Sequence, residues 1–270
     1  MKIYSQNSLY FNSRNIYIRK ADDIARHVNK TFPMFKPSYA IQNWKILNTS
    51  QQGKNQLRID FYKKHQGRVF AMRDEYRDDC SISPFEMKML QCVKEQKMGN
   101  CYESALITLG ALFANGFEKS KKVSPRVVIT GIDTRTKQTV ISKSFPIDHT
   151  CVLTSMNNSK KEAVDRAIVI DSWLNKAMSV PEAKEEFKKL ISKRELAGNF
   201  SEVQQELKWK LGRKKQGEIF VENKDFDLNN YEFKYDIHFV SDQDFVDSEI
   251  KQISQDIRKK YPQLIMDFLA

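Results

Sequence analysis

The chain has 270 residues, 40% hydrophobic and 29% charged, a composition ordinary for a soluble globular protein that buries a core without disulfide or metal staples. Aromatic residues make up 11%, and only 9 glycines and 7 prolines are present, which argues against wholesale disorder and long flexible linkers. The formal net charge of +11 favours an acidic partner, such as nucleic acid, an anionic membrane or an acidic protein surface.

The first 80 residues predict an N-terminal extension of mixed structure. A helix is expected from about Ala21 to Thr31, where apolar residues recur on one face. The alternation in Leu57–Tyr62 predicts a strand, and Arg68–Met72 is its expected pairing partner. Ser83-Pro84 then begins a helix that continues to Val93, since serine suits the N-cap and proline the first helical position.

A longer helix is predicted over Tyr102–Phe117, where apolar residues form a continuous stripe. The stripe consists of Ala105, Leu109, Leu112 and Phe113. Asn115-Gly116 is expected to close this helix with a left-handed C-cap, a conformation that glycine adopts without steric cost.

Beyond this helix the hydrophobic period changes to two, which indicates strands. The predicted strands are Arg126–Ile132, Val140–Phe145, His149–Thr154 and Ala167–Ile170. Short connections between consecutive strands favour a mostly antiparallel sheet. The later predicted elements are helices from Pro181 and over Ser201–Leu211, strands over Glu218–Val221 and Phe233–Val240, and helices over Asp244–Tyr261 and Leu264–Leu269.

This order of elements predicts an α+β fold, with helices segregated against one sheet. We expect residues 1–80 to be an extension packed on the core, residues 81–243 to form the core, and residues 244–270 to be C-terminal helices. Two basic clusters, Lys119–Lys122 and Arg213–Lys215, are interpreted as solvated faces. Because apolar residues nowhere form a run of the length that crosses a bilayer, no transmembrane helix is expected.

Cys101 is the candidate nucleophile because it opens the long helix directly after Gly99-Asn100. Asn100 suits the N-cap, and the positive end of the helix dipole favours the thiolate, which is the nucleophilic form of cysteine. Backbone N–H groups of the first turn can also donate to an oxyanion. The alternative interpretation is a small, inert residue that happens to start a helix.

His149 is the candidate general base, since it stands where an apolar strand begins downstream of the cysteine helix. A strand packed on that helix would bring the imidazole within hydrogen-bond reach of the thiol. The chain has 4 histidines, and the rival is His238, which has a similar strand-like context in YDIHFV. No orienting partner follows His238 on a neighbouring predicted strand, so His149 is preferred.

Asp171 is the candidate orienting carboxylate, because it ends the apolar run Ala167–Ile170. A carboxylate at the end of a neighbouring strand would fix the tautomer of His149 and stabilise its imidazolium. Trp173 would shield that ion pair from water. The alternative interpretation is that Asp171 only caps a turn.

Three segments resemble the papain-like cysteine enzyme superfamily in its broad sense, which includes transglutaminase-like enzymes. They are GNCYESA at Gly99–Ala105, DHTCVL at Asp148–Leu153 and VIDSW at Val169–Trp173. In that superfamily a cysteine opens the central helix, a histidine begins a strand, and an Asp or Asn on the next strand orients the histidine. Asp171-Ser172-Trp173 is similar to the Asn-Ser-Trp of papain-type proteases, with the Asp that transglutaminase-like members carry.

The resemblance implies a papain-like catalytic core over residues 81–243, in which the helix that carries the nucleophile packs on an antiparallel sheet. It implies that Gln96 donates to the oxyanion, with Asn100 as the alternative side-chain donor; an exposed helix-end glutamine is the other interpretation of Gln96. Glu103 either stabilises the helix start or touches substrate. The chain lacks the CGSCW-type sequence of true papains. In this it is more similar to bacterial effector deamidases and proteases that are injected into host cells.

The 4 cysteines include no CxxC pair, and the N-terminal segment has no apolar core of the signal-peptide type. We therefore expect reduced thiols and neither a metal ion nor another cofactor. The expected location is the cytosol, or a host cell into which the protein is delivered without a cleavable signal peptide.

These features predict a cysteine-dependent enzyme that acts on an amide carbonyl of a protein substrate through a thioester, with deamidation or crosslinking of glutamine favoured. One alternative is a papain-like cysteine protease, and another is an acyltransferase of the arylamine acetyltransferase type. A further alternative is a non-catalytic basic protein that binds nucleic acid or anionic lipid. Nucleic acid is disfavoured, since the chain has no zinc-finger spacing, RNA-binding signature or basic leucine-zipper pattern.

Overall fold

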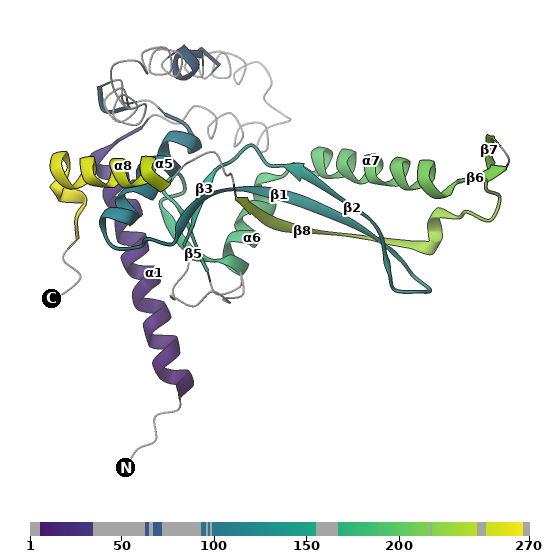
Figure 1. Cartoon of the computed structure of the whole chain (residues 1–270), viewed down its shortest axis with the longest axis horizontal. Coiled ribbons are helices and arrows are strands. Elements are labelled where there is room, and N and C mark those ends of the chain that lie inside the picture. Colours follow the sequence, from purple (N-terminus) through teal and green to yellow (C-terminus); the bar gives the residue numbers. More distant parts are fainter. Residues whose placement is uncertain are drawn as a thin grey trace, which may run out of the picture. The chain divides into compact units, whose positions relative to one another are not determined.

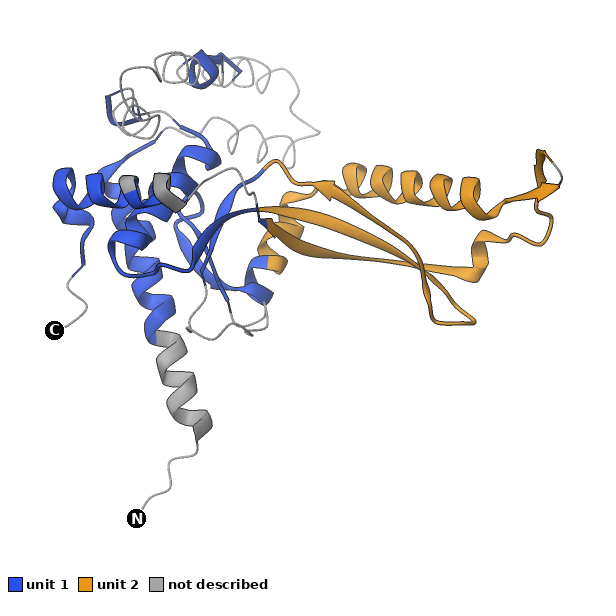
Figure 2. Cartoon of the chain, viewed as in Figure 1, with its two compact units in different colours: residues 1–123, 149–183, 241–270 blue, residues 124–148, 184–240 orange. Residues whose placement is uncertain are grey.

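The chain forms two compact units. The computed structural model describes residues 6–34, 63–64, 67–71, 93–95, 97, 99–154, 167–216, 218–241 and 247–266 (Figure 1). The first unit lies within residues 1–123, 149–183 and 241–270, and the second within residues 124–148 and 184–240 (Figure 2). The chain combines helices with antiparallel strands, so the predicted α+β class is confirmed. The segment 81–243, expected to be one core, is divided between the two units.

The sheet of the first unit joins segments that are far apart in the chain. Its strands, in spatial order, are the start of β1 (Ser120–Asp133), β3 (Cys151–Thr154), β4 (Ile168–Asp171) and β5 (Lys176–Ser179). All three neighbouring pairs are antiparallel, and Val152 of β3 lies opposite Ile170 of β4. Every residue of β3 and β4 is buried, which explains why both strands are continuous apolar runs and not alternating ones.

Helices from both ends of the chain form the core of this unit together with the central helix. They are α1 (Gln6–Thr31), α5 (Cys101–Ala114), α8 (Asp247–Lys260) and the 3-10 turn η3 (Pro262–Leu264). All residues of α5 from Glu103 to Leu112 are buried, as expected for a helix that is apolar around most of its circumference. The core side chains include Ala21, Ile24, Val28, Leu106, Leu109, Val152, Ile168, Ile253 and Ile257.

The C-terminus of α5 has the predicted left-handed cap. The helix ends at Ala114, and Gly116 follows with a φ of +84°. Its N–H donates to the Phe113 carbonyl at 3.1 Å, and the N–H of Phe117 donates to the Leu112 carbonyl at 2.9 Å, which is the Schellman pattern. The Asn115 side chain also donates to the Leu264 carbonyl at 2.8 Å, so the cap fastens the C-terminal segment to α5.

The second unit is built on the rest of β1. Its other elements are β2 (Thr139–Pro146), most of α6 (Val180–Leu190), α7 (Lys193–Leu211), β6 (Arg213–Gln216), β7 (Ile219–Glu222), η2 (Leu228–Asn230) and β8 (Tyr231–Ser241). Both β2 and β8 pair with β1, and the β1–β2 register shifts between Gly131 and Ile132. A separate antiparallel hairpin joins β6 to β7 directly after α7 (Figure 1).

Several predicted elements are confirmed, and others are wrong in their bounds or type. The four central strands, the two late strands and the mostly antiparallel pairing are confirmed. The strand expected over Arg68–Met72 is wrong, since residues 67–71 are helical and Val69 is buried. The helix expected over Leu264–Leu269 is also wrong at its start, because a 3-10 turn ends at Leu264 and residues 265–266 are not helical. The strand expected over Leu57–Tyr62 lies outside the described residues.

Two strands and the extension of α1 carry no clear local signal, whereas the earlier start of α7 carries a capping-box signal that the prediction missed. α1 begins at Gln6, well before Ala21, and α7 begins at Lys193, where a Ser192–Glu195 capping box starts it. β5 is a four-residue edge strand without apolar alternation, so its pairing with β4 and a hydrogen bond from the Ala177 N–H to Asp22 (2.9 Å) define it. β6 consists of RKKQ and is a strand because it pairs with β7.

The contact between α5 and α8 depends on Gly110. A Cβ at this position would lie 2.3 Å from Cγ2 of Ile253 and 2.9 Å from Cδ1 of Ile257. Gly198, in an exposed turn of α7, has open space around the same position. The two glycines therefore form a matched pair for substitution by alanine.

Gly110→Ala is expected to lower the free energy of unfolding by about 1–2 kcal/mol, since overpacking outweighs the gain in helix propensity. Gly198→Ala should raise it by about 0.5–1 kcal/mol, because the same gain comes without a clash. Urea titrations followed by circular dichroism measure both values. Equal effects of the two substitutions would contradict the close packing of α5 on α8.

Candidate active site

Cys101 is the first residue of α5, and its side chain is partly exposed. The predicted N-cap position of Asn100 is confirmed, with an extended backbone (φ −116°, ψ −172°). Oε2 of the fully buried Glu103 accepts a hydrogen bond from the Asn100 N–H at 2.8 Å. Of the two roles considered for Glu103, this contact is that of a helix cap, and it places a carboxylate at the positive end of the helix dipole.

Gly99 allows close packing directly before the thiol. A Cβ at Gly99 would lie 2.5 Å from Sδ of Met34 and 3.3 Å from Cβ of Glu103. Met34, just beyond α1, is itself buried. The start of α5 is thus held between its own Glu103 and the segment that follows α1.

His149 lies two residues before the start of β3 and is buried in the first unit. Its Nε2 is 2.6 Å from Oδ2 of Asp171, and the two residues are 7% and 1% exposed. Asp171 is the last residue of β4, the strand that pairs with β3. The antiparallel pairing of two short strands therefore brings together two residues that are 22 positions apart in the chain.

The two carboxylate oxygens of Asp171 have different partners. Oδ2 contacts His149, whereas Oδ1 accepts hydrogen bonds from the backbone N–H groups of Trp173 (2.9 Å) and Leu174 (3.1 Å). Asp171 therefore makes the contacts of both roles that its sequence position leaves open, which are capping a turn and orienting the imidazole. The turn holds the carboxylate in place while its other oxygen faces the histidine.

Cys101 also interacts with the imidazole. Burial disfavours the charged ring, but the Asp171 charge and hydrogen bond, followed by a side-chain hydrogen bond and charge from Cys101, raise the pKa of His149 from 6.5 to about 10. Since Nε2 faces Asp171, Nδ1 is the ring nitrogen left for the thiol. The structure therefore brings Cys101, His149 and Asp171 into one connected chain.

Trp173 packs against this chain of residues. Its ring meets the His149 ring edge to face, with centroids 6.1 Å apart and an angle of 87° between the planes. Trp173 is 7% exposed, so its indole covers the imidazole with apolar surface. Exclusion of water strengthens the electrostatic interaction between His149 and Asp171.

Ser172, which lies between Asp171 and Trp173 in the sequence, belongs to a buried cluster of hydroxyl groups. Its Oγ is 2.6 Å from Oγ of Ser104 and 2.7 Å from Oγ1 of Thr108, both on α5. The Asn29 side chain of α1 donates to the Ser172 carbonyl and, at 3.2 Å, to Oδ1 of Asn175. Hydrogen bonds thus connect the turn after β4 to both α5 and α1. The sequence signal for this cluster is the spacing of Ser104 and Thr108, which are four residues apart and therefore share one face of the helix.

Lys122 departs from the solvated role expected for its basic cluster. It is 5% exposed, and its Nζ lies 4.6 Å from the centre of the Tyr102 ring. A cation over an aromatic face is favourable, most of all when it is shielded from water. This contact places a positive charge beside the residue that follows Cys101.

The remaining predicted residues fall elsewhere. Gln96 lies outside the described residues, so the structure offers no geometry for its expected oxyanion role. His238 is exposed on β8 in the second unit, where its Nε2 is 3.8 Å from Oδ2 of Asp236. Within the described part of the chain, no group of three or more His, Cys, Asp or Glu side chains is arranged to hold a metal ion.

Comparison of the chain with protein-family models, with curated proteins and with solved structures found no match. None of the helices among the described residues has the length and apolar content needed to cross a bilayer.

The raised pKa of His149 predicts a pH dependence of stability. Because the folded pKa of about 10 exceeds the ordinary value of 6.5, the stabilisation is complete below pH 6.5 and is lost as pH rises toward 10. Between pH 6.5 and pH 10, the free energy of unfolding of the wild type should fall by on the order of a few kcal/mol relative to that of His149→Gln. Urea titrations of both proteins at several pH values measure the difference, and a constant difference would show that His149 is neutral in the folded protein.

Proposed function

We propose that this chain is a cysteine-dependent enzyme that attacks an amide carbonyl of a protein substrate through Cys101. The observation that carries the proposal is the connected chain of three side chains: a partly exposed thiol at a helix start, a buried imidazole and a buried carboxylate. Nucleophile, base and orienting group in this order are what acyl transfer by a thiol requires. Cys101 lies at a helix N-terminus and contacts His149, as the nucleophile in this proposal requires.

The reaction proceeds in two steps. Sγ of Cys101 attacks the carbonyl carbon, the carbon–nitrogen bond breaks, and the leaving nitrogen takes the proton from His149. Backbone N–H groups at the start of a helix point along its axis, and in this proposal those of α5 donate to the oxyanion of the tetrahedral intermediate. Water or an amine, deprotonated by His149, then attacks the thioester carbon, and the carbon–sulfur bond breaks to restore Cys101.

The nature of the amide and of the acceptor sets the reaction class. A glutamine side chain and water give glutamate and ammonia, a glutamine side chain and an amine give a crosslink, and a peptide bond with water gives proteolysis. We favour glutamine deamidation or crosslinking, because residue 171 is the Asp that the transglutaminase-like members of the resembled superfamily carry. The papain-like protease is the second candidate, supported by Ser172-Trp173 and by the packing of Trp173 on His149.

A papain-like core is part of this proposal. In its support, the cysteine opens the buried helix α5, the histidine precedes β3, and the aspartate ends β4, which neighbours β3. The resemblance to bacterial effector deamidases and proteases makes proteins of a host cell the substrates to test first. The net charge of +11 favours substrates with an acidic surface.

Iodoacetamide is expected to alkylate Cys101 near neutral pH well before the buried Cys151 and the two other cysteines, Cys80 and Cys92. Asp171→Asn should slow the reaction of Cys101 at least about tenfold, because the imidazolium loses its partner charge. Asp148→Asn, the same change at an exposed carboxylate next to His149, is the matched control and should leave the rate unchanged. Uniform, slow alkylation of all cysteines would favour a non-catalytic binding protein.

The reaction class follows from mass spectrometry of host-cell proteins incubated with the wild type or with Cys101→Ala. A glutamine that gains about 1 Da marks deamidation, one that gains an amine with loss of ammonia marks crosslinking, and a new terminus marks proteolysis. We expect glutamine modification that depends on Cys101. Identical spectra with the two proteins, across a broad set of host proteins, would rule out the enzymatic proposal.

A further inference from the structure

The C-terminal end of α7 and the β6–β7 hairpin expose large apolar side chains. Trp209, Ile219 and Phe220 are 63%, 64% and 68% exposed, and Leu211 is 37% exposed. By contrast, Val203 and Leu207 on α7 are fully buried, so the helix already has a core-facing side. Exposed apolar side chains gathered in one place mark an interaction surface more often than a solvated one.

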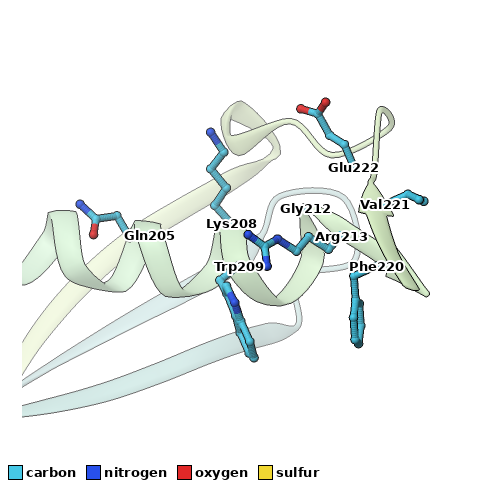
Figure 3. Close-up of a pocket in the computed structure, with 8 residues that line it drawn as sticks. All are labelled: Gln205, Lys208, Trp209, Gly212, Arg213, Phe220, Val221 and Glu222. Atoms are coloured by element: carbon cyan, nitrogen blue, oxygen red, sulfur yellow. The ribbon is translucent and has the colours of Figure 1, made fainter. Parts of the chain in front are cut away.

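Two of these side chains, Trp209 and Phe220, border a hollow of about 650 Å³ within the second unit. Figure 3 shows Trp209 and Phe220 projecting in the same direction from the helix and the hairpin. The residues that line the hollow are Gln205, Lys208, Trp209, Gly212, Arg213, Phe220, Val221 and Glu222 (Figure 3). The volume falls in the range of sites that bind a ligand or a bulky side chain.

The hollow is held in shape by contacts between the helix end and the hairpin. The Asn223 side chain donates to the Leu211 carbonyl, and its N–H donates to the Gly212 carbonyl, both at 2.8 Å. At Gly212 a Cβ would lie 2.4 Å from the Lys208 carbonyl oxygen, so glycine is required for this exit from the helix. The two walls are therefore positioned before any partner binds, which lowers the entropic cost of binding.

The side chains that line the hollow carry two positive charges and one negative charge. Lys208 and Arg213 line it, are exposed, and form no ion pair with any residue that the structure describes. Neighbouring Lys210 and Lys214 are instead paired, with Glu206 and Asp225. Figure 3 shows Arg213 between Trp209 and Phe220, whereas Lys208 and the one lining carboxylate, Glu222, both point away from these two rings.

We propose that this hollow docks an acidic protein segment. One large apolar side chain of the partner lies between Trp209 and Phe220, and carboxylates that flank it pair with Lys208 and Arg213. A concave site suits an inserted side chain, whereas a bilayer is entered by apolar side chains that project beyond their surroundings. Single-stranded nucleic acid requires a track of cations along its backbone, and the hollow itself is lined by two cations, Lys208 and Arg213. The proposal does not depend on the reaction at Cys101.

Selection of random displayed peptides on the full-length Cys101→Ala protein tests the proposal, since that variant cannot trap substrates covalently. Enriched peptides should carry Phe, Tyr, Trp or Leu beside Asp or Glu. Binding of the most enriched peptide is then measured by fluorescence anisotropy. Trp209→Ala and Arg213→Glu should each weaken binding at least about tenfold, as expected for central contact residues.

Two controls separate the hollow from its surroundings. Ile219→Ala removes an equally exposed apolar side chain that does not line the hollow, and Lys193→Glu reverses an exposed charge at the other end of α7. Both should leave the affinity within about twofold of the parent. Enrichment without acidic residues, or binding insensitive to Trp209→Ala, would overturn the proposal. So would Trp209-dependent binding of phosphatidylserine vesicles or oligothymidylate when no peptide is enriched.

Discussion

The contact between His149 and Asp171 sets the strictest physical requirement on the first unit. Both side chains are almost fully buried, and burying charges is costly unless each one is paired and hydrogen-bonded. Asp171 meets this requirement with three donors, the imidazole and the N–H groups of Trp173 and Leu174. The backbone after β4 must therefore turn in one particular way, and β3 must begin beside that turn.

The rest of the first unit supports that arrangement from several directions. α5 contributes the Ser104 and Thr108 hydroxyls that hold Ser172, and α1 contributes Asn29, which holds the same turn by its carbonyl. Gly110 lets α8 approach the opposite part of α5, and Asn115 fastens the C-terminal segment. α1 and α8, expected in an N-terminal extension and among C-terminal helices, are thus part of the hydrophobic core that also contains α5, the helix of the proposed nucleophile.

The second unit differs from the first in the side chains that it exposes. Its paired strands and α7 expose charged and aromatic side chains, and its most distinct feature is an open hollow between a helix end and a hairpin. A buried, desolvated site suits bond making and breaking, while an exposed apolar site with unpaired cations suits reversible docking. Chemistry and recognition, as proposed, would then belong to separate units of one chain.

The sequence by itself determined those features that depend on neighbouring residues. The start of α5 at Asn100-Cys101, its C-cap at Gly116 and the strands over residues 126–132, 140–145 and 233–240 are local patterns of capping and periodicity, and the structure contains them. The sequence also singled out Cys101, His149 and Asp171, because each stands at the end of a strong local element, and Trp173, because it follows Asp171 closely. Their grouping was an expectation drawn from the order of the elements and from a family resemblance.

Only the tertiary structure decided the features that depend on distant segments. β5 and β6 are strands because of their partners, and residues 67–71 are helical where a strand paired with Leu57–Tyr62 was expected. Lys122 is buried and lies over the Tyr102 ring. The role of Asn29, which reaches Ser172 across 143 positions, has no local signature at all. Local patterns record what a residue's own element requires, whereas pairing and burial also depend on surfaces that the rest of the chain supplies.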